Sequence, residues 1–98
     1  MKEFNLEGEL WVNAGEGGWH FITLPCDVSF SIRDLFKDLS PGFGSIPVHV
    51  KINNTKWDTS IFYDTKENAY LLPIKGVIRK KEKLKTNAVV KYSIEVIS

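Results

Sequence analysis

Three closely spaced glycines, Gly15, Gly17 and Gly18, precede Trp19 and His20 and raise the question of a phosphate-binding loop. A dinucleotide-binding fingerprint needs a further glycine where this chain has His20, and it needs a helix directly after the loop. The residues that follow are aromatic and β-branched, which favours a strand. A P-loop needs Gly-Lys-Ser/Thr, which this chain lacks. We therefore predict that these glycines form a turn between two strands.

Side chains suited to catalysis or metal binding are few. His20 and His49 are the only histidines, and neither has a partner at a metal-ligand spacing. Cys26, Ser45 and Ser60 are candidate nucleophiles for which either histidine could act as the base. The Gly-x-Ser-x-Gly elbow is absent, and spacing places no base beside any nucleophile. We therefore predict no catalytic residue, no metal and no cofactor, and an enzyme is the less favoured interpretation.

Basic side chains near the C-terminus are the clearest electrostatic feature. Residues 75–91 carry a charge of +6, whereas residues 1–74 carry −4. One interpretation is a solvated lysine-rich surface, because many surface lysines have no function. The other is an anion site, because helix starts and basic side chains both favour negative charge. The residues predicted to line that site are Lys75, Arg79, Lys80, Arg33, Ser45 and His20.

The three tryptophans, Trp11, Trp19 and Trp57, offer a further kind of chemistry. Exposed indoles can stack on bases or sugars. In small barrels they more often fill the core or cover one end. Trp11 lies on the side of its predicted strand that is opposite the apolar face, so it is expected to be either exposed or packed under the glycine loop.

The elements that must position these residues belong to a small single domain. The chain has 98 residues, of which 43% are hydrophobic and 26% charged, which is typical of one globular domain spanning 1–98. The net charge of +1 provides no overall attraction to nucleic acid or to an anionic membrane. One cysteine excludes an internal disulfide, and no apolar run approaches the roughly 20 residues of a membrane helix. A cytoplasmic location without a membrane is therefore expected.

Two-residue alternation and β-branched or aromatic composition predict that most of the chain is strand. The glycine loop is predicted to join the first two strands as an antiparallel hairpin. Turns are predicted at Asn53-Asn54 and over 63–68, and Pro25 and Pro73 are predicted to end the strands before them. The predicted strands span residues 4–12, 19–24, 46–52, 57–62, 69–72 and 90–96.

Two helices are predicted between the strands. An amphipathic stripe over 28–39 predicts the first, with Asp27 or Ser29 as its N-cap and Ser-Pro-Gly at 40–42 as its stop. Apolar residues between 74 and 84 predict a second, short helix, which Gly76 weakens. About six mostly antiparallel strands with two short helices favour a mainly β fold, closed into a β-barrel that hides the strand edges.

Several short motifs along the chain resemble an uncharacterised bacterial family, one of the catalogued domains of unknown function. They include GELW at 8–11, GGWHF at 17–21, GFGS at 42–45, WDTSIF at 57–62 and YLLP at 70–73. Members of that family are sometimes joined to a bacteriocin-protection (OmpD-associated) type domain. The resemblance implies a double-split β-barrel, the fold class that also holds AbrB-like and MazE-like DNA-binding proteins. It implies no activity and no catalytic residues.

Three functions follow as hypotheses. The favoured one is a non-enzymatic binding module, monomer or dimer, for a small anionic ligand or a protein partner. The second is a DNA-binding regulator, a hypothesis that rests on fold analogy. The acidic first 74 residues argue against a nucleic-acid partner, because they would repel the phosphate backbone. The third is an enzyme with a site across the barrel that uses His20.

Overall fold

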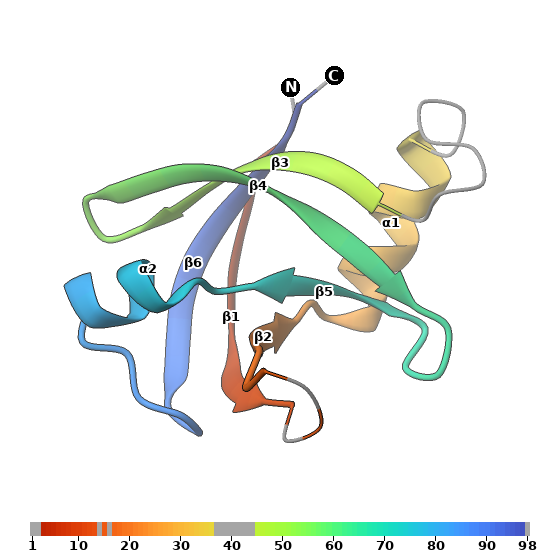
Figure 1. Cartoon of the computed structure of the whole chain (residues 1–98). Coiled ribbons are helices and arrows are strands. Elements are labelled where there is room, and N and C mark those ends of the chain that lie inside the picture. The colour runs from red at the N-terminus through yellow and green to blue at the C-terminus, as the bar shows by residue number, and fades with distance from the viewer. Residues whose placement is uncertain (1–2, 14, 16, 37–44, 98) are drawn as a thin grey trace.

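Six antiparallel strands close into a barrel that carries two short helices (Figure 1). The computed structural model describes residues 3–13, 15, 17–36 and 45–97. Around the barrel the order is β1-β2-β5-β4-β3-β6, so the first and last strands pair with each other. This confirms the predicted mainly β barrel with two short helices. The elements are β1 (Glu3–Val12), β2 (His20–Thr23), α1 (Cys26–Phe36), β3 (Ser45–Ile52), β4 (Thr55–Asp64), β5 (Ala69–Pro73), α2 (Gly76–Lys81) and β6 (Val89–Val96).

The barrel interior is filled by one face of each strand, as the alternation predicts. Along β3 the side chains alternate strictly between buried and exposed after Ser45, and β6 follows a similar pattern. Burying each such aliphatic side chain contributes roughly 1.5–3 kcal/mol, so this single core stabilises the whole domain. All six strands contribute to it, through residues such as Leu10, Ile22, Val50, Ile61, Leu72 and Ile94.

Gly8 allows β1 to pass close to β2. A Cβ at this position would lie 2.7 Å from Cγ2 of Ile22, which is itself fully buried. Because real Cβ atoms do not approach other heavy atoms so closely, any larger residue would force the buried Ile22 side chain or the strands to shift.

The turns use residues that tolerate a positive φ, as predicted. Gly17 and Gly18 have φ values of 67° and 63°, which strain any residue that carries a Cβ. The N–H of Asn13 donates to the carbonyl of Trp19 at 2.8 Å and closes the loop between β1 and β2. Asn53, with a φ of 54°, makes the turn between β3 and β4.

Strand β4 is longer than the predicted span of 57–62. It pairs with β3 from Thr55 opposite Ile52 onward, and at its other end Asp64 pairs with Ala69 of β5. Polar residues at both ends of β4 therefore belong to the ladder because their backbone groups find partners there. Local composition predicted a turn over 63–68, which in the structure begins only after Asp64.

Helix α1 begins earlier than predicted, so neither Asp27 nor Ser29 is its N-cap. The helix starts at Cys26, and the N–H of Ser29 donates to the carbonyl of Pro25 at 2.9 Å. Pro25 directly precedes the helix, and because its carbonyl oxygen accepts this first helical hydrogen bond it occupies the N-cap position. Asp27 lies in the first turn, where its charge is favourable to the helix dipole.

Ser29 instead attaches α1 to the barrel. Its side chain is fully buried, and its Oγ accepts a hydrogen bond from the backbone N–H of Tyr70 in β5 at 3.0 Å. Ile32, one turn further along, is buried in the same core. The predicted continuation of this helix to residue 39 and its stop at 40–42 lie outside the described residues.

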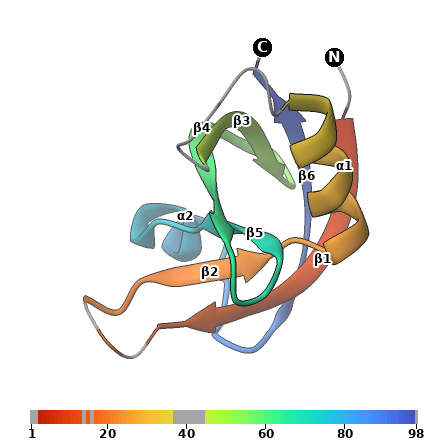
Figure 2. The ribbon, with the colours of Figure 1, turned by 90° about the vertical axis from the view of Figure 1, so that its right-hand side faces the viewer.

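Helix α2 is shorter than the apolar pattern predicted, and it lies on the opposite side of the barrel from α1 (Figure 2). It ends at Lys81 because Lys83 adopts a φ of 55°, so Leu84 falls outside it. The Glu82 carboxylate accepts hydrogen bonds from Thr55 Oγ1 at 2.5 Å and from Asn53 Nδ2 at 2.6 Å. These two bonds, that from Thr55 first, lower the pKa of Glu82 and fasten the end of α2 to the β3–β4 turn.

The sequence contains no apolar run long enough for a membrane helix, and the lengths of the helices in the structure can be compared with that prediction. Across residues 3–13, 15, 17–36 and 45–97, no helix is both long enough and apolar enough to cross a bilayer.

Candidate functional site

A hollow of about 240 Å³ lies between the glycine loop and the start of α2, and we call it the basic groove. Pairing of β2 with β5 builds it, because Phe21 lies opposite Pro73 and the N–H of Ile74 donates to the carbonyl of His20 at 2.9 Å. The residues that follow β5 are thereby placed beside the residues that precede β2. The groove is lined by Gly17, Gly18, Trp19, His20, Pro73, Ile74, Lys75, Gly76 and Arg79.

His20 is oriented by contacts at both ring nitrogens. Nδ1 lies 2.8 Å from the carbonyl oxygen of Gly18, which can only accept, so Nδ1 carries the proton. Nε2 lies 3.4 Å from Nη1 of Arg79 and 3.3 Å from Oγ1 of Thr86, and it accepts from these donors. The imidazole therefore lies against the guanidinium group of Arg79.

Arg79 is held by a backbone contact as well as by His20. Its Nε donates to the carbonyl of Ile74 at 3.3 Å, which fixes the plane of the guanidinium. Gly76 leaves space for this group, since a Cβ there would lie 3.3 Å from Nη2. Lys75, exposed at the rim, adds a second permanent positive charge. Within the described part of the chain, neither Lys75 nor Arg79 forms an ion pair.

The structure brings together only part of the predicted anion site. His20, Lys75 and Arg79 line the basic groove, whereas Lys80 is exposed on α2 and does not line it. Arg33 lies on α1 and Ser45 begins β3, both away from the groove. Sequence reasoning placed these six residues together by charge and by loop composition, neither of which encodes which strands pair.

Several residues that line or contact the basic groove were not among the predicted site residues. Trp19 and Gly17 line it, and Thr86 contacts His20 from the loop between α2 and β6. From the sequence we predicted that the glycine loop is a turn and not a phosphate-binding loop; Gly17 and Gly18 have the positive φ of such a turn and also line the groove. Thr86 carries no signal of its role in the sequence, because it is 66 residues away from His20 along the chain.

Arg33 lies instead in a second hollow of about 760 Å³, which we call the α1 groove. Its guanidinium carbon lies 4.4 Å above the ring of Tyr63, a cation–π geometry. Tyr63 in turn meets Tyr70 edge-on, with ring centroids 5.2 Å apart. Burial raises the pKa of Tyr70, and Arg33 partly opposes that shift. The residues that line the α1 groove are Cys26, Asp27, Phe30, Arg33, Asp34, Tyr63 and Asn68.

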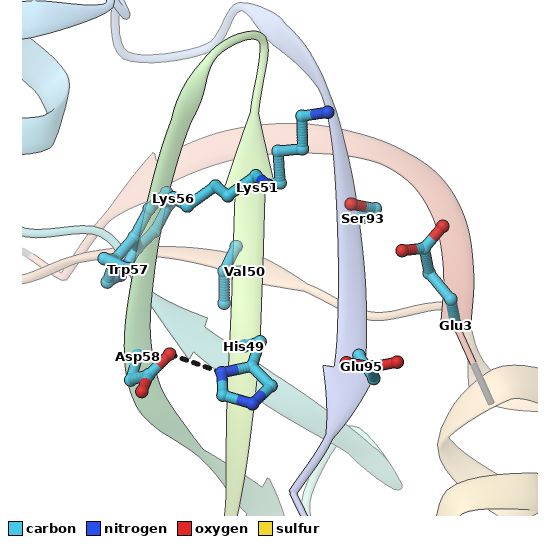
Figure 3. A pocket seen from close by; sticks show the side chains of 9 residues that line it. All are labelled: Glu3, His49, Val50, Lys51, Lys56, Trp57, Asp58, Ser93 and Glu95. Atoms are coloured by element: carbon cyan, nitrogen blue, oxygen red, sulfur yellow. Dashed lines mark hydrogen bonds and ion pairs between the residues drawn. The ribbon is translucent and has the colours of Figure 1, made fainter. Parts of the chain in front are cut away.

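A third hollow, of about 650 Å³, lies on the outer face of β3, β4 and β6 (Figure 3). Register places one row of side chains directly opposite one another across four strands, namely Glu3, Glu95, His49 and Asp58. The next row is formed in the same way by Asn5, Ser93, Lys51 and Lys56. The outer face therefore carries an acidic row with three carboxylates beside a basic row with two lysines, so positive charge in this hollow is opposed by nearby carboxylates.

His49 in this third hollow forms a close pair with Asp58, with 2.5 Å between Nδ1 and Oδ1 (Figure 3). A histidine oriented by a carboxylate is one part of a nucleophilic triad. Within the described residues, however, no hydrogen bond joins His49 to a serine or a cysteine, and Ser93 is drawn well away from its ring. The pair is an exposed cross-strand contact of the kind that stabilises sheets.

The other candidates for catalysis and metal binding are equally separated. Cys26 is exposed, and its Sγ lies 3.8 Å from the carbonyl oxygen of Glu67 and not beside a base. Outside the masked positions at 1–2, 14, 16, 37–44 and 98, no group of three His, Cys, Asp or Glu side chains could hold a metal ion. Of the three hollows, the basic groove alone has permanent positive charge and a lining without a carboxylate.

Comparison with known proteins places the chain in a family. No curated protein matches it. The sequence profile described as "Domain of unknown function (DUF1905)" matches residues 7–94, which reach from β1 to β6 and include the whole basic groove. This agrees with the resemblance to an uncharacterised family of domains of unknown function, and the chain therefore belongs to the DUF1905 family.

Proposed function

We propose that this chain is a non-enzymatic binding module that holds a small anionic ligand in the basic groove. The observation that supports it most is the convergence of Arg79 and His20, whose Nη1 and Nε2 atoms are 3.4 Å apart, beside the positive charge of Lys75. The residues that line the groove include no carboxylate to neutralise Lys75 and Arg79. An anion between Lys75 and Arg79 would accept charge-assisted hydrogen bonds from both.

The size of the groove limits what enters it. Its volume of about 240 Å³ is below the roughly 300–1,000 Å³ of pockets that enclose a drug-sized ligand. A phosphate or carboxylate group fits such a space, with the remainder of the ligand outside. The guanidinium of Arg79 can bind either group in a bidentate manner, because its N–H donors form a planar fork.

Two other hypotheses have less support. A DNA-binding regulator would use the basic residues between 75 and 85, but duplex binding rests on fold analogy alone. A protein partner that presents an acidic group would use the same groove as a small anion. For an enzyme, His20 would need a nucleophile or substrate-activating partner, and its contacts in the described chain are Gly18, Thr86 and Arg79.

The proposal is tested by calorimetric titration of the protein with phosphate, sulfate and small carboxylates at low ionic strength, together with thermal unfolding. Binding at 100 times the dissociation constant stabilises by about 2.7 kcal/mol, which raises the melting temperature of a domain this size by roughly 10 °C or more. The double variant Lys75→Ala, Arg79→Ala should lose both the heat signal and the shift. A matched control, Lys56→Ala with Lys66→Ala, removes two exposed lysines that do not line the groove and should retain them.

Several outcomes would contradict the proposal. The site is wrong if no anion binds, or if the double variant binds as tightly as the native protein. Arg79→Lys serves where Arg79→Ala unfolds the protein, because it keeps the charge and removes the planar fork. A gel-shift titration with random duplex at ~50 mM salt tests the DNA hypothesis separately, since non-specific affinity is highest at low salt.

A further inference from the structure

An aromatic ladder lies on the outer face of the β1–β2 hairpin and ends at the basic groove. It consists of Trp11, Phe21 and Trp19. The rings of Trp11 and Phe21 have centroids 5.2 Å apart, and those of Phe21 and Trp19 are 6.2 Å apart and nearly parallel at 14°. Trp11 is not exposed, as one of the two predicted alternatives had it; it is half-buried and its ring packs against Phe21.

Both ends of the ladder are held in place. Nε1 of Trp11 donates to Oγ1 of Thr23 at 2.9 Å, which orients the inner end. At the outer end, a Cβ on Gly17 would lie 3.3 Å from Cδ1 and Nε1 of Trp19, so the glycine loop lies directly against the indole. Trp19 nevertheless remains 59% exposed and lines the basic groove. An indole that is positioned on two sides and still exposed is a preorganised stacking surface.

We propose that the basic groove takes an anion joined to a planar aromatic ring, as in a nucleoside phosphate, with the ring against Trp19 and the charge at Lys75 and Arg79. This inference rests on the proposed function of the same groove and specifies its ligand. A phosphate group suits the small charged hollow, and the ring lies outside it, where the exposed indole provides a sequence-tolerant π face. The shared chemistry is that of a free nucleotide or of one nucleotide within a single strand.

The experiment separates the ring from the charge with four probes: inorganic phosphate, ribose 5-phosphate, adenosine and adenosine 5′-monophosphate. Calorimetric titration should give adenosine 5′-monophosphate an affinity about tenfold or more above that of ribose 5-phosphate, because stacking on an aromatic side chain contributes that much per base. Adenosine alone should bind more weakly than its monophosphate. Trp19→Ala should remove the tenfold advantage of adenosine 5′-monophosphate over ribose 5-phosphate.

Controls keep the result interpretable. Phe30→Ala removes another exposed aromatic ring, 72% exposed on α1 and away from the groove, and should leave all four affinities unchanged. If Trp19→Ala lowers the melting temperature, Trp19→Leu keeps apolar volume without a π face and should give the same loss of the advantage. Quenching of tryptophan fluorescence by adenosine 5′-monophosphate should disappear in both variants, although Trp11 and Trp57 remain.

The outcomes distinguish the two proposals. If phosphate and ribose 5-phosphate bind but the ring adds nothing, the aromatic ligand is wrong and the anion site stands. If adenosine binds as tightly as its monophosphate, the charge has no role and the inference fails. If no probe binds, both proposals fall. A short oligoadenylate that binds more tightly than the monophosphate, and loses that affinity in Trp19→Ala, supports the inference with a single strand as the source of the nucleotide.

Discussion

Tyr92 allows a test of the barrel interior, because the removal of its hydroxyl group should stabilise the protein. It lies on β6, it is only 4% exposed, and its ring approaches to 4.0 Å of where a Cβ on Gly8 would stand. Its hydroxyl is buried and has no hydrogen-bond partner among the described residues. A hydroxyl moved from water into such a site without a partner costs about 1–3 kcal/mol.

Tyr92→Phe removes this cost and changes little else. The ring keeps its volume, and the lost oxygen forfeits only a few dispersion contacts of about 0.1–0.2 kcal/mol each. We therefore expect the free energy of unfolding to rise by about 1 kcal/mol at pH 7. For a domain of this size that corresponds to an increase in melting temperature of about 4–8 °C.

Alkaline pH provides a second measurement on the same residue. Burial raises the pKa of Tyr92 above its ordinary value of 10.0, because the phenolate would be desolvated. The unfolded chain therefore loses this proton before the folded chain does, and stability falls as pH rises beyond 10 by about 1.4 kcal/mol per pH unit for this one group. Tyr92→Phe lacks the group, so its stability advantage should widen between pH 10 and pH 11.

Urea unfolding at pH 7 and at several alkaline values measures both effects. Tyr63→Phe is the matched control, because its hydroxyl is hydrogen-bonded to Oδ1 of Asn68 at 3.3 Å and its side chain is half-buried. It should change stability by less than about 0.5 kcal/mol. A Tyr92→Phe protein less stable than the native one at pH 7 would refute the reasoning, since it would mean that the hydroxyl has a partner inside the barrel.

Three further substitutions test contacts elsewhere. Gly8→Ala should destabilise by about 1–3 kcal/mol in urea unfolding, because the new Cβ would lie 2.7 Å from Ile22 Cγ2; an unchanged midpoint would show that the strands separate easily. Ser29→Ala should lower the free energy of unfolding by about 1–3 kcal/mol, because it leaves the buried N–H of Tyr70 in β5 unpaired. A loss below about 0.5 kcal/mol, as is usual for an exposed surface residue, would contradict the role of Ser29 in attaching α1 to β5. Glu82→Gln should lower the free energy of unfolding at pH 7. Because the pKa of Glu82 is lowered in the folded state, the stability difference between the variant and the native protein should shrink as pH falls below 4.5. A stability difference that is independent of pH would exclude the ionised contact with Thr55.

Much of the fold follows from local patterns. Alternation over β1, β3 and β6 determines which side chains face the core, because successive residues of a strand point to opposite faces. The glycines at 17 and 18 and the asparagine at 53 determine turns through their tolerance of positive φ. These are properties of neighbouring residues, so they can be recognised before any tertiary contact is known.

Boundaries and helix ends were less predictable because partners elsewhere decide them. The ends of β4 are strand because β3 and β5 accept their backbone hydrogen bonds, although their composition is polar. Ser29 looked like a cap, but it serves as an acceptor for a strand N–H that lies 41 residues further along the chain. In each case a long-range hydrogen bond outweighed a local preference.

The sequence by itself determined that Lys75 and Arg79 belong to a strongly basic segment and that His20 follows a tight glycine turn. Only the tertiary structure decided that His20 and Arg79, 59 residues apart, meet in one groove and that Arg33 and Ser45 do not join them. The physical reason is the order in which the strands close. Charge and turn chemistry act on near neighbours, whereas the pairing of β2 with β5 depends on how six apolar faces together fill one core.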